Sequence, residues 1–400
     1  MIEFLKRTWA QINLDAVEHN FRVINESLSS GCRAMAIVKA DAYGHGAGYV
    51  SRALRDAGAE WFGVSNLDEA LQIREEGIDE SILILAYTPP SMAFRLAENR
   101  ITQTVFTREY AQRLSRAAEE SGVRVRVHIK LDTGMSRIGF FCQNDQGIKD
   151  SVDEIEAVCS LPGIEAEGIF THFTSADEEQ GEEFTGLQYD RFQKVIKELE
   201  ARGVRFALRH CCNSAATMRF PEMHLDLVRP GLILYGLSPA QWMDGTLPLI
   251  PAMELKTVVS MVKTVPSGTA VSYGRTFTAN GEAALATLPI GYADGFPRGM
   301  SNRAEMLVGG RRAPVVGRVC MDQCMLDVTG IDGVYEGATV TVFGRDGDAV
   351  LPVEEFAALS GTINYETVCL IGKRVPRIFQ SGGQMIGQLN YIGNHRGDLA

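Results

Sequence analysis

Residues 34–40 read AMAIVKA, a short apolar run that predicts a β-strand with a lysine near its end. Seven more runs of this kind follow, separated by segments with helical spacing or by loops that lead into them. They cover 61–66, 82–87, 102–106, 126–132, 165–173, 207–214 and 225–231. Strands that alternate with helices occur in doubly wound sheets and in barrels. The count of eight favours a (β/α)8 barrel.

The sequence on either side of these eight runs follows other patterns. Thr8 to Leu14 predicts a strand that need not belong to the barrel, and 15–29 predicts a helix with Asp15 as its N-cap. After about residue 245, short strands alternate with glycine turns, which is typical of a separate, mostly β domain. These strands are expected at 255–265, 283–289, 304–308, 313–328 and 338–343. We therefore predict a barrel domain over 1–245, a β-rich domain over 246–380 and a flexible tail over 381–400.

Composition and charge exclude several classes of protein. The net charge of −11 disfavours a nucleic-acid partner, because phosphate backbones are bound by clustered Lys and Arg. No apolar run approaches the length of a membrane helix, and the N-terminus does not resemble a signal peptide. The eight cysteines form no CxxC pair, and the CxxxC pair at Cys320 and Cys324 lacks a second ligand pair, so no metal site is expected. Free thiols in a reducing cytoplasm are the simplest interpretation.

Ionisable and polar residues gather at the carboxyl ends of the expected strands, where barrel enzymes place their active sites. They are Lys39, Lys130, Asp132, Arg137, His172, Asn213, Ser214 and Arg229. Lys39 follows a run of Ala, Ile and Val, and burial there would lower its pKa toward the neutral amine that Schiff-base chemistry needs. A lysine that reaches solvent or pairs with Asp41 is the other interpretation of the same residue.

The last two loops of a barrel commonly bind phosphate. Here they offer the Ser214 hydroxyl and the backbone N–H groups around Gly231, which together could hold an anion. The alternative is that Ser214 caps a helix and Gly231 serves a turn. A reactive lysine and a phosphate site on one barrel face suggest pyridoxal phosphate, although a phosphosugar aldolase would show the same pair.

A longer set of motifs resembles the alanine racemase family along nearly the whole chain. The motifs are AIVKADAYGHG (36–46), IKLDTGMSRIGF (129–140), NSAAT (213–217), VRPG (228–231), SYG (272–274), GYADG (291–295), GRVCMDQ (317–323), NYE (364–366) and KRVPR (373–377). The resemblance implies a barrel followed by a β domain. It also implies pyridoxal-phosphate-dependent racemisation of alanine, which supplies D-alanine for peptidoglycan.

The same resemblance implies roles for individual residues around the cofactor. Lys39 would bond covalently to it. Its phosphate would be held by Tyr43, Ser214, Gly231, Leu232 and Tyr365. Arg229 would face the pyridine nitrogen, where a fixed cation disfavours protonation of that nitrogen and makes the ring a weaker electron sink. Arg137 would contact the phenolic oxygen of the cofactor and the substrate.

Racemisation requires a base on each face of the planar carbanion, and the resemblance supplies two. Lys39 would serve one face and Tyr273, from the partner subunit, the other. A tyrosine of ordinary pKa is a poor base at neutral pH, and His172 is the candidate that assists it. Met321 and Tyr292 resemble residues that reach the other subunit's substrate site. The active site would therefore require a homodimer.

Two further features rest on the resemblance. Lys130 matches a lysine that is carbamylated in many relatives, and an anion there would relieve the repulsion between two cations at one mouth. A Lys130–Asp132 ion pair is the simpler alternative. The corridor to the site would be lined by Asp177, Arg298, Arg318 and Ile363. As surface charges these residues would otherwise form ordinary salt bridges.

Three other functions compete with alanine racemisation. A serine or broad-spectrum racemase would be favoured by a smaller residue at position 365, whereas Tyr365 narrows the pocket toward a methyl side chain. A basic-amino-acid decarboxylase of the same barrel type would place a carboxylate at the pyridine nitrogen, where Arg229 stands. A non-enzymatic pyridoxal-phosphate-binding protein would resemble the barrel alone and would lack the β domain that carries Tyr273.

Overall fold

The computed structural model describes residues 4–393 and 395–398, which form two compact units. The barrel unit comprises residues 16–42 and 47–250. The β unit comprises the segment up to Asp15, residues 43–46 and the chain from Pro251 onward. The chain therefore passes between the two units several times, and the N-terminal strand belongs to the β unit. Within the described residues, no helix is long and apolar enough to cross a bilayer.

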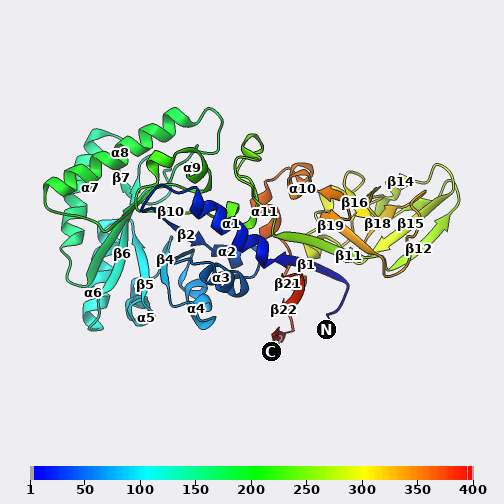
Figure 1. Cartoon of the computed structure of the whole chain (residues 1–400), viewed down its shortest axis with the longest axis horizontal. Coiled ribbons are helices and arrows are strands. Elements are labelled where there is room, and N and C mark those ends of the chain that lie inside the picture. The colour runs from blue at the N-terminus through cyan, green and yellow to red at the C-terminus, as the bar shows by residue number, and fades with distance from the viewer. Residues whose placement is uncertain (1–3, 394, 399–400) are drawn as a thin grey trace. The chain divides into compact units, whose positions relative to one another are not determined.

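The barrel unit contains the eight parallel strands that the sequence predicts (Figure 1). They are β2 (Arg33–Ile37), β3 (Trp61–Val64), β4 (Ser81–Ile84), β5 (Ile101–Val105), β6 (Val125–Asp132), β8 (Ile164–Phe170), β9 (Leu208–His210) and β10 (Leu227–Val228). Two backbone hydrogen bonds link the last two strand segments, from Asp226 N to Arg209 O at 3.1 Å and from Arg229 N to Cys212 O at 3.0 Å. The (β/α)8 barrel is thus confirmed as nearly closed, and a doubly wound sheet is excluded.

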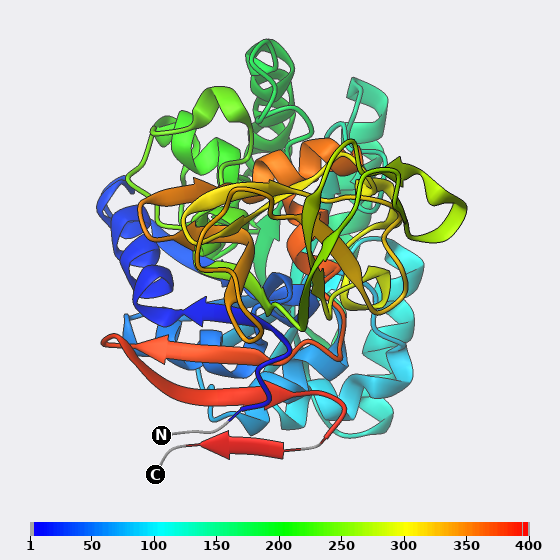
Figure 2. The same cartoon turned by 90° about the vertical axis from the view of Figure 1, so that its right-hand side faces the viewer.

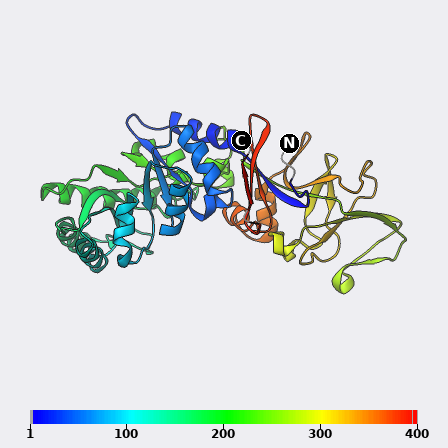
Figure 3. The same cartoon turned by 90° about the horizontal axis from the view of Figure 1, so that it is seen from below.

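Helices lie outside these strands (Figure 3). They are α3 (Ala47–Asp56), α4 (Leu67–Glu75), α5 (Ala93–Glu98), α6 (Arg108–Glu120), α7 (Asp145–Cys159), α8 (Glu182–Ala201) and α9 (Ser214–Arg219). Side-chain caps begin several of them, as where Thr107 accepts from Tyr110 N. The barrel core is apolar, and β3 and β5 are buried at every position. The fold therefore carries the carboxyl ends of eight strands to one face.

The β unit is built around one large sheet. Its strands follow the order β17 (Arg311–Pro314), β16 (Glu305–Val308), β19 (Thr339–Asp346), β11 (Met253–Val258), β1 (Thr8–Asn13), β21 (Arg377–Ser381), β22 (Gln384–Asn390) and β23 (His395–Asp398), and β20 (Ala349–Leu351) pairs with β19. Figure 2 shows β1, in blue, beside β21 and β22, in red. A second sheet joins β12 (Met261–Val265), β15 (Ala283–Leu288) and β18 (Cys324–Asp327), while β13 (Ala270–Val271) pairs with β14 (Phe277–Thr278). Helices α10 (Val353–Ser360) and α11 (Asn364–Cys369) complete the unit.

The C-terminal segment differs from the flexible tail expected over 381–400. Residues 384–390 form β22, which pairs antiparallel with β21, and 395–398 form β23 beside it. Gly382 and Gly383 both have positive φ, 58° and 73°, as a two-residue hairpin turn requires. A Gly-Gly pair between two strands predicts a turn. The prediction missed it because the apolar pattern of residues 384–390 is too weak to identify them as a strand.

The first helix also begins differently from the prediction. Helix α1 covers Leu14–Glu26, so Asp15 lies in its first turn and is not its N-cap. The Asp15 carboxylate accepts from Ser381 Oγ at 2.9 Å and from Gly382 N at 2.8 Å instead. It therefore fastens the β21–β22 turn. The strand expected over 313–328 is instead divided between β17 and β18, because Gly317 has φ of 74° and residues 316–323 form a loop between them.

Candidate active site

The segment after β2 carries Lys39 into an unusual backbone turn. Residues 40–43 all have φ between 53° and 55°, a left-handed conformation that L-residues adopt at a cost of about 1–2 kcal/mol each. The Ala40 N–H donates to Glu69 Oε1 at 2.9 Å, and Asp41 Oδ1 accepts from Ala47 N at 2.8 Å. Strain that the surrounding structure holds in place is characteristic of functional sites. Lys39 itself is partly buried at the barrel mouth.

Arg229, just after β10, is buried at the same mouth and anchored by several acceptors. Its Nη1 donates to His210 Nδ1 at 2.8 Å, and its Nη2 donates to the carbonyl oxygens of Thr171 and Cys211 at 2.8 and 2.9 Å. Burial lowers the pKa of Arg229 to about 10, so it stays a cation at neutral pH. In the part of the chain that the structure describes, no protein group accepts from its Nε, which leaves that N–H for a ligand.

His172 stands beside Arg229 at the end of β8. Burial, followed by the charges of Arg229, Lys130, Arg137 and Lys39, holds its pKa well below the ordinary value, so the imidazole is neutral. Its Nδ1 lies 3.3 Å from Arg229 Nη2. Nη2 has two N–H groups and three acceptors, so the contact with His172 shares a hydrogen with Thr171 O or Cys211 O. Since arginine only donates, we assign the proton of His172 to Nε2. The ring therefore presents a donor on its other side.

Lys130 lies near the carboxyl end of β6 and is only 3 % exposed. Burial and the charges of Arg229 and Arg137 lower its pKa to about 7, against the raising effect of Asp132. Its Nζ donates to Leu131 O at 2.6 Å, whereas Asp132 accepts from Gly134 N, Ser136 N and Gln143 Nε2. The Lys130–Asp132 ion pair, the alternative to a carbamylated Lys130, is not among the salt bridges of the described residues. Arg137 lies exposed in the loop after β6.

The last two barrel loops meet through a hydrogen bond from Gly231 N to Ser214 Oγ at 2.9 Å. Ser214 begins α9 and Leu232 begins the 3-10 helix Leu232–Tyr235, so two helix starts lie together. The N-cap of α9 is Asn213, which accepts from Ala216 N at 3.0 Å, and Ser214 is not the cap. The Ser214 side chain is therefore left to link the two loops.

Tyr43 and Tyr365 lie together in the β unit. Their ring centroids are 6.4 Å apart, and burial raises the pKa of Tyr43 well above its ordinary value. Tyr43 ends the left-handed turn, and Tyr365 lies in α11. A Cβ on Gly44 would collide with the carbonyl of Val368, so the turn needs glycine at this position to pack against α11. The two tyrosine side chains are therefore neighbours where the left-handed turn packs against α11.

Tyr273 projects from the β unit on a strained turn. Ser272, Gly274 and Arg275 have φ of 63°, 71° and 49°, and the Ser272 hydroxyl donates to Arg318 O at 2.6 Å. The tyrosine is 72 % exposed. An aromatic side chain held away from its own core by a fixed turn is suited to contact another molecule.

Tyr292 and Met321 are neighbours in the β unit, and both are exposed. The Tyr292 N–H donates to Cys320 O at 3.1 Å, and Ala293 N donates to Met321 O at 3.1 Å. The buried Asp294 fixes this pair of loops, because it accepts from Gly291 N at 2.9 Å and binds Arg7 and Arg374. The GYADG motif therefore serves to position Tyr292 and Met321.

The residues of the expected corridor lie in both units. Asp177 is in the barrel unit, where its carbonyl accepts from Trp242 Nε1 at 3.0 Å. Arg298, Arg318 and Ile363 are in the β unit, and Ile363 is exposed. Their part in a corridor stays a prediction.

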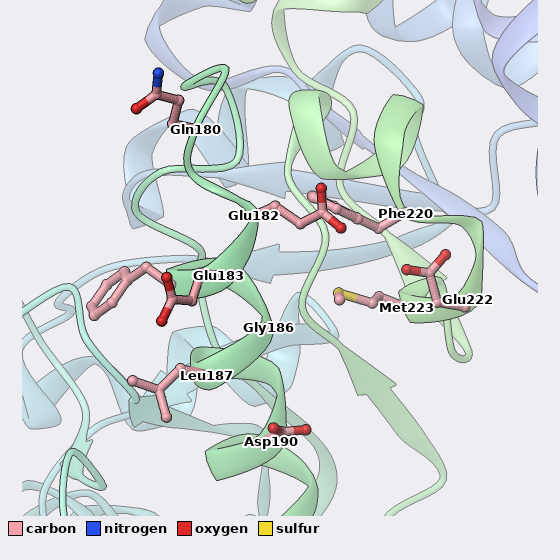
Figure 4. Close-up of a pocket in the computed structure, with 10 residues that line it drawn as sticks. Gln180, Glu182, Glu183, Gly186, Leu187, Asp190, Phe220, Glu222 and Met223 are labelled. Atoms are coloured by element: carbon pink, nitrogen blue, oxygen red, sulfur yellow. The ribbon is translucent and has the colours of Figure 1, made fainter.

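A separate hollow of about 730 Å³ lies beside α8. Figure 4 shows the carboxylates of Glu182, Glu183, Asp190 and Glu222 around it. An acidic lining does not suit an anionic cofactor, and none of the predicted site residues lines this hollow. The barrel mouth therefore remains the candidate site.

The sequence prediction missed residues that support the mouth from below. His210 and His128 lie in β9 and β6, and both are fully buried. Their signal was present, since each histidine sits inside an apolar strand run, where a polar side chain needs a partner. Asp294 was missed because its partners, Arg7 and Arg374, are distant in the sequence. Glu69 was missed because its partner, Ala40 N, depends on the left-handed turn.

Two family models match the chain. "Alanine racemase, N-terminal domain" matches residues 12–239, and "Alanine racemase, C-terminal domain" matches residues 252–379. The alanine racemase of Desulforamulus reducens is 49 % identical over 372 residues, 93 % of this chain and 98 % of that protein. The alanine racemase of Desulfovibrio desulfuricans is 46 % identical over 383 residues, 95 % of this chain and 100 % of the relative.

Solved structures agree with these matches. The alanine racemase of Clostridium difficile 630 superposes with a TM-score of 0.92 at 37 % identity, covering 98 % of this chain and 100 % of that one. The alanine racemase of Bacillus anthracis with bound L-Ala-P gives a TM-score of 0.89 at 38 % identity, with the same coverage. The chain therefore belongs to the alanine racemase family.

Proposed function

We propose that this protein interconverts L- and D-alanine with pyridoxal phosphate as cofactor, and that its D-alanine supplies peptidoglycan. The observation that carries the proposal is Arg229, a buried cation fixed at the barrel mouth with an N–H still available. A donor there suits an unprotonated pyridine nitrogen. A decarboxylase of this barrel type would need a carboxylate at the same place.

The other mouth residues fit the same cofactor. Lys39 follows β2 on a strained turn that holds it at the mouth, and it would carry the cofactor. Ser214 and Leu232 offer a hydroxyl and a helix-start N–H group to a phosphate, and on the family resemblance the Gly231 N–H, which here donates to Ser214 Oγ, is a further ligand. On the family resemblance, Tyr43 and Tyr365 are further phosphate ligands, and Arg137 contacts the phenolic oxygen and the substrate. Bound pyridoxal phosphate withdraws electrons from the substrate and makes its Cα proton acidic.

Two side chains would then move the proton on opposite faces of the substrate. We propose Lys39 for one face and Tyr273 of a partner subunit for the other. His172 is neutral with its proton on Nε2, so it can donate to the Tyr273 oxygen and stabilise the phenolate that acts as base. Arg229 keeps His172 in this tautomer because Nδ1 accepts from a group that only donates.

The exposed side chains of the β unit support a homodimer with shared sites. Tyr273, Tyr292 and Met321 are large residues that fixed loops hold in solvent, as an interface between subunits would require. A two-fold dimer would contribute them to both sites. We also propose a cytoplasmic location, because all eight cysteines are free thiols.

The direct test incubates the purified holoenzyme with L-alanine in heavy water and follows Cα deuteration and D-alanine formation. L-Serine and L-lysine are run beside it. D-Alanine formation that is fast, and much slower for serine, would support the proposal. Lys39→Ala should abolish the reaction, whereas Lys149→Ala, an exposed lysine on α7, should leave it intact. Cofactor absorbance without deuteration of any amino acid would instead favour a binding protein.

A further inference from the structure

A row of buried polar side chains runs from Arg229 into the barrel interior. Arg229 Nη1 lies 2.8 Å from His210 Nδ1, and His210 Nε2 lies 2.9 Å from His128 Nδ1. His128 Nε2 in turn lies 3.6 Å from Glu167 Oε2, which is close for a charge but long for a hydrogen bond. Both histidines are fully buried, so these contacts account for most of their polar atoms.

The direction of every bond in this row follows from its first member. Arginine only donates, so His210 Nδ1 accepts and the proton of His210 is on Nε2. That proton is donated to His128 Nδ1, which places the proton of His128 on Nε2, toward the Glu167 carboxylate. Burial is the largest cause that lowers the pKa of both histidines, and the charge of Arg229 adds to it. At His128 the contact with Glu167 opposes burial without reversing the direction, so both rings are neutral, as the row requires.

Residues of the barrel strands pack closely against the two histidine rings. Gly168 faces His128 across β8 and β6, and a Cβ on Gly168 would lie 2.7 Å from the His128 ring. Phe170 stacks on His210 with ring centroids 4.7 Å apart and an angle of 5°. The rings therefore have little freedom to turn and exchange their nitrogens.

The row also suggests how the positive charge of the buried Arg229 is balanced. Within residues 4–393 and 395–398, no carboxylate forms a salt bridge with the buried Arg229. Glu167 is the carboxylate at the far end of the row, and the pKa of its side chain is lowered: burial opposes ionisation, but the contact with His128 and the charge of Arg126 outweigh it. Two neutral rings with aligned dipoles lie between the cation and this anion, and His128 Nε2 approaches the carboxylate without a hydrogen bond of ordinary length.

We propose that Glu167, His128 and His210 are positioning residues for racemisation: they form a one-directional relay that fixes Arg229 as a donor toward the cofactor and balances its charge. This proposal rests on the proposed function for its catalytic meaning, but its geometry is testable without it. A barrel core that merely contains polar residues would not require one defined tautomer on each ring.

The first test is a neutron structure of the holoenzyme at neutral pH. We expect deuterium on Nε2 of both His210 and His128, and none on Nδ1 of either. Deuterium on either Nδ1 would overturn the relay even in an active racemase. Conversely, the expected pattern in a protein that fails to racemise any amino acid would leave the relay standing and remove the proposed function.

The second test compares variants that keep or remove the relay. His128→Gln retains an acceptor and a donor, whereas His128→Leu retains neither. We expect the leucine variant to lower kcat for alanine roughly tenfold with KM within about twofold, and the glutamine variant to keep kcat within about threefold. An equal loss in both, or no loss in either, would overturn the proposal.

A third comparison does not depend on His128→Leu and can be made even if that variant fails to fold. Glu167→Gln removes the charge at the end of the relay, and Glu165→Gln removes an equal charge from an exposed position of the same strand. We expect kcat to fall about threefold in the first variant alone. Equal kcat values in the two variants would overturn the role of Glu167 as the balancing charge.

Discussion

The carboxylate of Asp294, which is fully buried, binds two guanidinium groups at once: Arg374 Nε at 2.8 Å and Arg7 Nη1 at 2.9 Å. These arginines come from opposite ends of the chain, and Asp294 also accepts from Gly291 N. One side chain therefore ties the first strand region, the Tyr292 loop and the segment before β21 into one unit. A buried charge with this many partners is costly to disturb.

We predict that Asp294→Asn destabilises the protein by about 2 kcal/mol, or roughly 4–8 °C in the midpoint of thermal unfolding. Asp322→Asn is the matched control, because Asp322 also binds Arg374 but is largely exposed, and it should cost less than about 1 kcal/mol. Equal shifts in the two variants would show that burial of Asp294 does not matter.

The contacts of Asp294 with the two arginines also predict how stability depends on pH. Burial raises the pKa of Asp294, but its hydrogen bonds to Arg374, Arg7 and Gly291 outweigh burial and lower the pKa below its ordinary value. The contribution to stability is therefore present above the unfolded pKa of about 3.9 and is lost as pH falls through the folded pKa. Thermal unfolding measured from pH 7 to pH 3 should show the wild type and Asp294→Asn converging at acid pH. A constant difference would contradict this.

Lys130 is predicted to react with carbon dioxide. Its pKa of about 7, lowered by burial and by Arg229 and Arg137, leaves a large fraction of neutral amine near neutral pH. We expect a carbamate signal from 13C-bicarbonate by NMR that grows as pH rises through about 7 and is absent in Lys130→Ala. Activity lost in Lys130→Ala should be partly restored by small carboxylates, which replace the anion beside Arg137. A variant without rescue would count against the carbamate.

How far the sequence predicts this molecule depends on whether the information is local. The eight barrel strands are separate apolar runs, and Lys39, His172, Ser214 and Arg229 follow from their position at strand ends together with the family motifs. The partner of a strand is not local information: Thr8 pairs with Thr257, and Ala10 pairs with Arg377. Periodicity identifies β1 as a strand but cannot show that it belongs to the distant sheet.

The supporting residues of the site show the same limit. His128 and His210 are visible as polar residues in apolar strands, yet their hydrogen bond joins positions 82 residues apart. Likewise, four consecutive left-handed residues after Lys39 cannot be read from ADAY, since among these residues only Asp visits that conformation, and then as a single residue. Such strain is held by the fold as a whole, through Glu69 and the packing around Gly44.

Tyr273 should be essential for racemisation but not for folding. Because Tyr273 is 72 % exposed in its own chain and the substitution removes only its hydroxyl, Tyr273→Phe should leave the midpoint of thermal unfolding unchanged while lowering alanine racemisation by roughly 10²–10⁴-fold. One enantiomer should still exchange its Cα proton with heavy water, since Lys39 remains. Tyr335→Phe is the control, because Tyr335 is similarly exposed in the same unit and has no proposed role. Undiminished racemisation in Tyr273→Phe would exclude it as the second base.

The shared site can be tested by mixing two inactive proteins. If each site takes Lys39 from one subunit and Tyr273 from the other, a dimer of Lys39→Ala with Tyr273→Phe has one site with both defects and one intact site. Random exchange of subunits should therefore restore about a quarter of wild-type activity, since about half of the dimers are mixed and each has one good site. If both residues acted within one subunit, every site in every dimer would carry one defect, and mixing would restore nothing. Exchange itself can be followed by mass spectrometry of isotopically labelled subunits, so that absence of recovery is not confused with absence of mixing.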